Sequence, residues 1–322
     1  MNNTLKDKHR SFSKLSSMHF IHRYCNHEHL NILVWGRYKN VYKVNVEDFD
    51  TYQIDSHTPL TSLEENKFWY ATAVIKDSIF FFGGDKPVFT TTVQKYSLFT
   101  DTWFTANTDM CGRREQYIVC TLMDKVYIIG GCINYHYGYN DPLFPLKPLN
   151  SCLQFDSTTA KWKQVGEMNE ERVNAACALF EGGIVVCGGN GGDGVLKRSV
   201  ERYDHVADTW SYMPSMITSR RGHKLVSTRN KLFAIGGTRE RWEFEMFDST
   251  CGRFVSLHSL YNQIPYFDRL NYEAALSIEK TLVVISNTET LYYDVETGES
   301  LTNFCNITVD LQGISCVIVP RF

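Results

Sequence analysis

The sequence predicts an all-β fold, a six-bladed β-propeller, because one pattern recurs six times along its 322 residues. In each copy an apolar strand ends at a Gly-Gly pair or its equivalent. A further strand then ends in an aromatic residue, typically before Asp, and another aromatic residue follows at a fixed offset. The clearest copy runs from Gly183 to Trp210. A repeat of about 50 residues with four short strands is typical of propeller blades.

The ends of the apolar strands define the period. The six equivalent positions lie 47, 47, 58, 48 and 50 residues apart. Gly36 and Ser286 hold the position in the two weaker copies at the ends of the chain. The four Gly-Gly pairs begin at Gly83, Gly130, Gly188 and Gly236. We call the four strands of a blade A to D, so that these pairs follow strand B.

A second set of positions keeps the same period. The aromatic residue near the end of strand C and the residue that opens strand D are seven apart, which fits a strand end, a tight turn and a strand start. We expect these rings to pack against the neighbouring blade, where each buries about 150–250 Å². The pairs are Tyr96 and Trp103, Phe155 and Trp162, Tyr203 and Trp210, and Phe247 and Phe254, with Asn45 and Tyr52, and Tyr293 and Ser300, at the ends.

The chain resembles the kelch domains of the BTB-kelch (kelch-like) family over residues 30–322. The resemblance is carried by SVERYDHVADTWSYMPSMITSRRGH at 199–223, by KVYIIGG at 125–131 and by KLFAIGG at 231–237. It implies a propeller that binds a protein partner. Family members place BTB and BACK domains ahead of the propeller, and the BTB part docks on a cullin. We therefore expect cullin contact only through a BTB domain, which is absent from this chain.

The repeat also predicts how the ring closes. Blade one has no strand A of its own, whereas the segment from Gly313 to Val319 is an unused strand of that kind. We expect this segment to pair into blade one, which removes two exposed strand edges. Residues 1–30 are then a polar N-terminal tail and 31–322 the propeller. The blades fall near 31–63, 64–110, 111–168, 169–217, 218–262 and 263–308, with 309–322 as the closing strand.

Composition excludes several classes of partner. The net charge of −3 predicts no nucleic-acid or anionic-membrane surface, and no apolar run is long enough to span a bilayer. The N-terminus lacks the apolar core of a signal peptide. The ten cysteines form no CxxC motif, which favours buried free thiols in a reducing compartment, and hence a cytoplasmic protein.

No segment indicates catalysis, a cofactor or a metal. The GxGxxG match at 189–194 leads into a strand at 199–204 rather than a helix, so we interpret it as a glycine-rich loop between strands B and C. The segment from His19 to His29 holds four histidines and Cys25, but its spacing fits no closed zinc site. No GxSxG, HExxH or P-loop motif occurs. We expect no enzyme, although a propeller enzyme stays as an alternative.

The resemblance implies a partner-binding face built from the B–C loops and from the segment leading into strand A, here called the lead-in segment. The third blade also carries about ten extra residues in its B–C loop. The lead-in arginines either contact a partner or brace neighbouring blades. The insertion either contacts a partner or folds back on its own propeller. Both questions stay open. The candidates are Tyr70, Arg114, Arg172, Arg221 and Asn271 in lead-in segments, Tyr135, Tyr137 and Tyr139 in the insertion, and Arg239.

The function expected from the resemblance is protein–protein interaction. The finer prediction is a substrate-recognition propeller of a cullin-RING ubiquitin ligase adaptor. The alternative among binding proteins is an actin or cytoskeleton binder.

Overall fold

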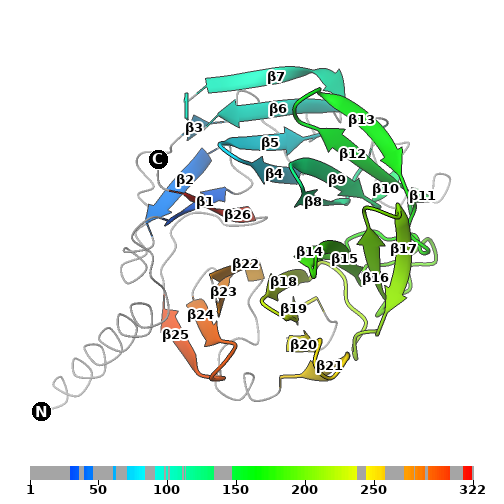
Figure 1. Ribbon diagram of the computed structural model, residues 1–322. Helices are drawn as coiled ribbons and strands as arrows, with labels where there is room; N and C mark the ends of the chain where they lie inside the picture. Colours follow the sequence, from blue (N-terminus) through cyan, green and yellow to red (C-terminus); the bar gives the residue numbers. More distant parts are fainter. Residues whose placement is uncertain are drawn as a thin grey trace, which may run out of the picture. The chain divides into compact units, whose positions relative to one another are not determined.

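The computed structural model (Figure 1) describes residues 30–35, 40–45, 61–62, 71–83, 91–97, 99–100, 102–110, 112, 114–133, 147–237, 244–257, 272–278, 280–286, 289–304 and 315–320. These residues form strands and turns, and no helix occurs among them. The chain divides into two compact units, Glu64–Asn262 and Met1–Leu63 with Gln263–Phe322. Each unit is described by itself.

The unit Glu64–Asn262 holds four antiparallel sheets of four strands, in which each strand pairs with the next one of its blade. They fall in the ranges predicted for blades 2 to 5. The strands are β4 (Ala71–Ile75), β5 (Ser78–Phe82), β6 (Thr92–Ser97) and β7 (Thr102–Asp109); β8 (Ile118–Leu122), β9 (Lys125–Ile129), β12 (Cys152–Asp156) and β13 (Lys161–Val165); β14 (Ala176–Phe180), β15 (Gly183–Cys187), β16 (Val200–Asp204) and β17 (Thr209–Met213); and β18 (Lys224–Thr228), β19 (Lys231–Ile235), β20 (Phe244–Asp248) and β21 (Arg253–Ser256).

The second unit holds two more four-stranded sheets. Blade 6 consists of β22 (Tyr272–Ile278), β23 (Thr281–Ser286), β24 (Glu289–Asp294) and β25 (Ser300–Phe304). Blade 1 consists of β26 (Ser315–Pro320), β1 (Leu30–Trp35), β2 (Asn40–Asn45) and β3 (Thr61–Ser62). The strand β26 pairs with β1 along its full length, from Leu30↔Pro320 to Trp35↔Ser315. A strand from the C-terminus therefore supplies strand A of blade 1, the place that the repeat assigns to it.

The seven-residue spacing of the aromatic pairs has a direct structural cause. Both members lie opposite each other across the C–D ladder, as in Tyr203↔Trp210 and Phe155↔Trp162. Their ring centroids are 5.1 and 4.8 Å apart. Directly opposed side chains are the closest neighbours on one face of an antiparallel pair. Seven residues is therefore the distance along the chain between two opposed positions of the C–D hairpin.

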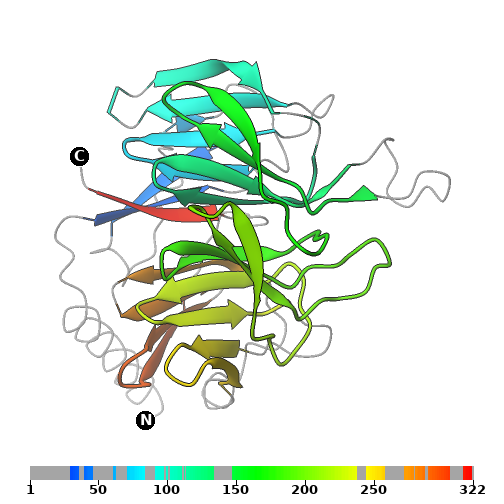
Figure 2. The same cartoon turned by 45° about the vertical axis from the view of Figure 1, so that its right-hand side comes forward.

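Aromatic side chains of strand C join neighbouring blades within the unit Glu64–Asn262, where the sheets face each other (Figure 2). Phe155 lies 5.7 Å from Phe82 of the preceding blade, measured between ring centroids. Phe247 likewise lies 5.9 Å from Phe180. The expected packing of rings between blades is confirmed for Phe155 and Phe247. The all-β class is confirmed as well, while the closing of six sheets into one ring stays a prediction.

Candidate partner-binding surface

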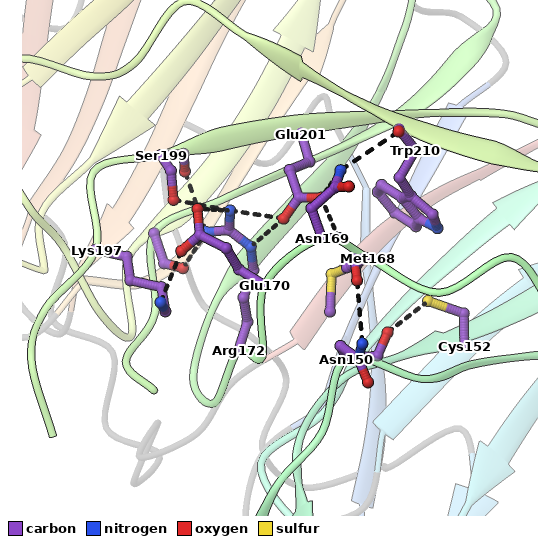
Figure 3. A network of polar contacts seen from close by, with 11 residues as sticks. Asn150, Cys152, Met168, Asn169, Glu170, Arg172, Lys197, Ser199, Glu201 and Trp210 are labelled. Carbon is purple, nitrogen blue, oxygen red and sulfur yellow. Dashed lines mark hydrogen bonds and ion pairs between the residues drawn. The ribbon is translucent and has the colours of Figure 1, made fainter. Parts of the chain in front are cut away.

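The lead-in segment of blade 4 is anchored by a buried arginine (Figure 3). Arg172 is 1% exposed, and it donates hydrogen bonds to the carbonyl oxygens of Gly188 at 2.8 Å and Ser199 at 3.1 Å. It also bonds to Ser199 Oγ at 2.9 Å and to Glu201 Oε1 at 2.9 Å. All these partners belong to blade 4. The guanidinium thus ties the lead-in segment to strands B and C of its own blade.

Blade 5 repeats this arrangement with Arg220. Its guanidinium is buried and bonds to the carbonyl oxygen of Gly236 at 2.6 Å and to Glu245 Oε1 at 2.8 Å. The sequence singled out Arg221 as the lead-in arginine of blade 5, but the arginine equivalent to Arg172 is its neighbour Arg220. Each bracing arginine lies 16 residues before the first glycine of its Gly-Gly pair. That constant spacing would have selected Arg220. Arg221 itself is exposed.

Blade 3 keeps the arginine but has an apolar residue at the strand C position of the carboxylate. Arg114 donates to the carbonyl oxygens of Gly130 at 3.2 Å and Ser151 at 2.9 Å, and to Ser151 Oγ at 2.9 Å. Leu153, a buried core residue, occupies the position that Glu201 holds in blade 4. The side chain of Arg114 is partly exposed.

The two buried carboxylates, Glu201 of blade 4 and Glu245 of blade 5, accept further hydrogen bonds. Glu201 accepts from Asn169, from the backbone N at 2.6 Å and from Nδ2 at 2.9 Å. Glu245 accepts from the backbone N atoms of Ile217 at 2.6 Å and Thr218 at 2.9 Å. Buried charges persist only where they are paired and hydrogen-bonded. The ion pairs therefore hold the chain that leads from one blade into the next.

The bracing arginines also link blades through their own backbones. The carbonyl oxygen of Arg172 accepts from Gly131 of blade 3 at 2.8 Å, and that of Arg220 accepts from Gly189 of blade 4 at 2.7 Å. A partner cannot reach the Arg172 side chain without breaking this network. For Arg172 the geometry therefore favours bracing over partner contact.

The lead-in segments reach the surface, partly or fully, two residues after Arg114, Arg172 and Arg220. Gln116, Asn174 and Gly222 hold equivalent places in blades 3, 4 and 5, with φ values of 54°, 53° and 63°. Asn174 N donates to Gln116 O at 3.1 Å, and Gly222 N donates to Asn174 O at 2.8 Å. Asn174 Nδ2 also donates to Gln116 Oε1 at 2.6 Å. We call this row the amide ladder. A Cβ at Gly222 would meet no other heavy atom within 4 Å.

One buried Cys–His pair includes the residue after Gly222, but it is not set up for nucleophilic catalysis. Cys187 Sγ and His223 Nε2 are 3.0 Å apart. Burial raises the pKa of Cys187 to about 12 and lowers the pKa of His223 to about 3. Both groups are therefore neutral near pH 7. A nucleophilic cysteine needs its thiolate, which an adjacent imidazolium stabilises.

The described residues hold no group of three His, Cys, Asp or Glu side chains that could bind a metal ion. No helix that could cross a bilayer was found in this part of the chain. The glycine-rich segment 189–194 is the B–C loop between β15 and β16, as expected. It therefore cannot present a helix N-terminus to a pyrophosphate group.

The root of the insertion in blade 3 is described, and its tip is not. A two-stranded ladder of β10 (Cys132–Ile133) and β11 (Lys147–Pro148) carries it. The B–C loop of blade 4 lies against this root, because a Cβ at Gly192 would contact the Pro148 ring at 3.6 Å. Outside the described residues lie Tyr70, Tyr135, Tyr137, Tyr139, Arg239, Asn271 and the segment from His19 to His29.

Comparison with known proteins decides the family. A model of the KLHDC2/KLHL20/DRC7 Kelch-repeats domain matches residues 22–247. The chain belongs to the kelch-repeat family. Human Kelch-like protein 35 is 30% identical over 129 residues, which are 39% of this chain and 19% of that protein. Kelch repeat protein C2 of camelpox virus (strain CMS) is 28% identical over 154 residues, 47% of this chain and 27% of that protein.

A solved structure supports the fold. The structure of YjhT aligns with a TM-score of 0.56 and 14% identity, and the alignment covers 70% of this chain and 73% of that chain. At this identity the likeness shows the fold alone, an all-β propeller. The matched segment is 19% of the length of human Kelch-like protein 35 and 27% of that of camelpox virus C2. The chain is therefore a kelch-repeat propeller, a module used mainly for protein interaction, as the sequence analysis predicted.

Proposed function

We propose that this propeller binds a protein segment at the end of its blades that carries the lead-in segments and B–C loops. We further propose that it recognises substrates for a cullin-RING ubiquitin ligase, with the cullin contact made by a BTB domain outside this chain. The ligase role rests on the resemblance to BTB-kelch proteins and on kelch-like relatives such as human Kelch-like protein 35.

The observation that supports this binding surface is a contrast between two adjacent arginines in one lead-in segment, of which one is buried and the other is exposed. Arg220 is buried in an ion pair, whereas Arg221, the next residue, is exposed beside the amide ladder. A guanidinium offers five N–H donors, and an amide side chain offers both donors and an acceptor. Such groups match the polar backbone of a peptide.

Rigid support should make this surface effective. Asn174 and Gly222 each lie two residues after a buried, ion-paired arginine, so the network holds their backbone in place. Groups that are already ordered lose less conformational entropy when a partner binds. Arg is also enriched among residues that dominate binding energy. We therefore expect Arg221 to contribute strongly to partner capture.

The test is capture of partners by the purified chain, comparing Arg221→Ala with Arg253→Ala. Arg253 is an exposed arginine after a C–D turn, at the opposite end of the same blade. Loss of a central arginine costs about 2 kcal/mol or more, so Arg221→Ala should weaken binding about 30-fold. Its Tm should stay near that of the parent. Equal binding by Arg221→Ala and the parent would contradict this surface.

Two further measurements separate the finer alternatives. Adding Tyr137→Ala to Arg221→Ala extends the capture test to the insertion of blade 3. The ligase role predicts that ubiquitination of the captured partner slows when this protein is depleted from cells. An unchanged rate contradicts the ligase role and leaves the binding surface standing. Co-sedimentation with actin filaments would favour the cytoskeletal alternative instead.

A further inference from the structure

Two thiols from neighbouring blades lie side by side in the unit Glu64–Asn262. Cys120 belongs to β8 of blade 3, and Cys177 belongs to β14 of blade 4. Cys177 Sγ donates to the carbonyl oxygen of Val119 at 3.3 Å, the residue before Cys120. Cys120 is part of a buried apolar cluster, and Cys177 packs against the same cluster. Neither is in a disulfide.

The other buried thiols of the described residues are placed differently. Cys132 Sγ donates to Glu115 O at 3.7 Å, and Cys152 Sγ donates to Asn150 O at 3.6 Å. Cys187 Sγ faces His223 Nε2. None of these three sulfurs bonds to a residue next to another cysteine, whereas Cys177 bonds to the carbonyl oxygen of the residue before Cys120.

The two cysteines differ in access to solvent. Cys177 is partly exposed, whereas Cys120 is buried. The hydrogen bond with Cys177, together with burial, raises the pKa of Cys120 well above its usual value. Cys120 therefore keeps its proton, and an oxidant in solution reaches Cys177 first. This division of an accessible cysteine and a shielded one is the arrangement of a reacting and a resolving thiol.

We propose that Cys120 and Cys177 form a reversible disulfide when the protein meets a peroxide. In the first step the Cys177 thiolate attacks a peroxide oxygen and the O–O bond breaks. A sulfenic acid forms, and the leaving hydroxide or alkoxide takes a proton from solvent to become water or an alcohol. In the second step the Cys120 sulfur attacks the Cys177 sulfur. An S–S bond forms, the S–O bond breaks, and the hydroxide leaves as water with the proton of Cys120. The two thiols are oxidised and the peroxide is reduced.

The cross-link would join the inner strands of two blades close to the amide ladder. Gln116 lies four residues before Cys120 and Asn174 lies three residues before Cys177. The oxidised protein would hold these two lead-in segments in one relative position. An effect on partner binding rests on the proposed function, whereas the cross-link itself does not depend on it.

The experiment treats the full chain with hydrogen peroxide in a Cys251→Ser background, which removes an exposed thiol. The protein is alkylated, digested with trypsin without reduction and analysed by mass spectrometry. We expect the peptide 115–125 joined to 173–197, lighter than their sum by two hydrogen atoms and released by a dithiol. Because 173–197 also contains Cys187, a second cleavage after Glu181 separates Cys177 from Cys187.

Matched variants identify the sulfurs. Cys120→Ser and Cys177→Ser should each abolish the joined peptide, and Cys152→Ser, at another buried thiol, should leave it. A joined peptide that carries Cys187 instead overturns the proposal. So does Cys177 oxidised to a sulfinic acid while Cys120 stays alkylated, and so does full alkylation of both. These outcomes can be read from the background protein even if a variant fails to fold.

Discussion

Blades 3 and 4 place the same arginine in the same lead-in segment, but the strand C position that is Glu201 in blade 4 is Leu153 in blade 3. Arg172 pairs with Glu201 and is buried, whereas Arg114 is partly exposed. Both arginines bond to the carbonyl oxygen of the first glycine after strand B. The shared contact is therefore the backbone one. The carboxylate adds a charge partner, which allows the guanidinium to be fully buried.

The largest expected effect is the loss of the arginine where its carboxylate is buried. Arg172→Met leaves Glu201 without its charge partner and should lower the free energy of unfolding by about 3–5 kcal/mol. Arg114→Met is the matched variant in blade 3, where the equivalent strand C position is the apolar Leu153. It should lower the free energy of unfolding by less. Urea titration of both variants measures the difference.

A double variant tests whether the ion pair itself is responsible. Arg172→Met with Glu201→Leu removes both charges and should recover a large part of the loss, since an apolar pair of similar volume often replaces a buried ion pair well. If Arg172→Met and Arg114→Met cost the same, the carboxylate is not what distinguishes the two blades.

The third residue after the bracing arginine differs between blades. In blade 5 this residue is a histidine, so we expect the free energy of unfolding to depend on pH. The residue is Tyr117 in blade 3, Ala175 in blade 4 and His223 in blade 5. Burial lowers the pKa of His223 to about 3, below its value of 6.5 in the unfolded chain. As the pH falls below 6.5, His223 binds a proton in the unfolded chain but not in the folded one. The folded protein therefore loses stability progressively between pH 6.5 and about pH 3.

The change is His223→Ala, measured as the pH dependence of the free energy of unfolding. In this window the parent should lose up to about 1.4 kcal/mol per pH unit through this residue. The variant should be less stable at pH 7 because of the cavity, but its slope should be shallower. Parallel slopes for the parent and variant would show that His223 does not titrate in this way.

The smallest expected effect concerns the tryptophans that open strand D. Trp210 Nε1 donates to Gly166 O of the preceding blade at 2.8 Å, whereas Trp162 Nε1 has no partner among the described residues. Trp210→Phe should therefore cost about 1–2 kcal/mol, since it leaves a carbonyl without its donor. Trp162→Phe should cost less by denaturant titration. The reverse order would contradict the difference between the blades.

The sequence by itself determined the elements that depend on local pattern. The Gly-Gly positions and the seven-residue aromatic spacing located strands B, C and D, because both follow from the geometry of a strand and a tight turn. The unused strand at 313–319 could likewise be assigned to blade 1, since a blade without strand A has an open edge.

Only the tertiary structure decided which side chains meet between repeats. Gly189 of blade 4 donates to the backbone carbonyl of Arg220 of blade 5, a contact that depends on how the two blades pack. Cys120 and Cys177 come from different blades, and their meeting depends on how the inner strands β8 and β14 pack. The spacing of hydrophobic residues and the turn residues predict the structure of segments that are close together in the sequence. Contacts between repeats follow from packing, which no local pattern encodes.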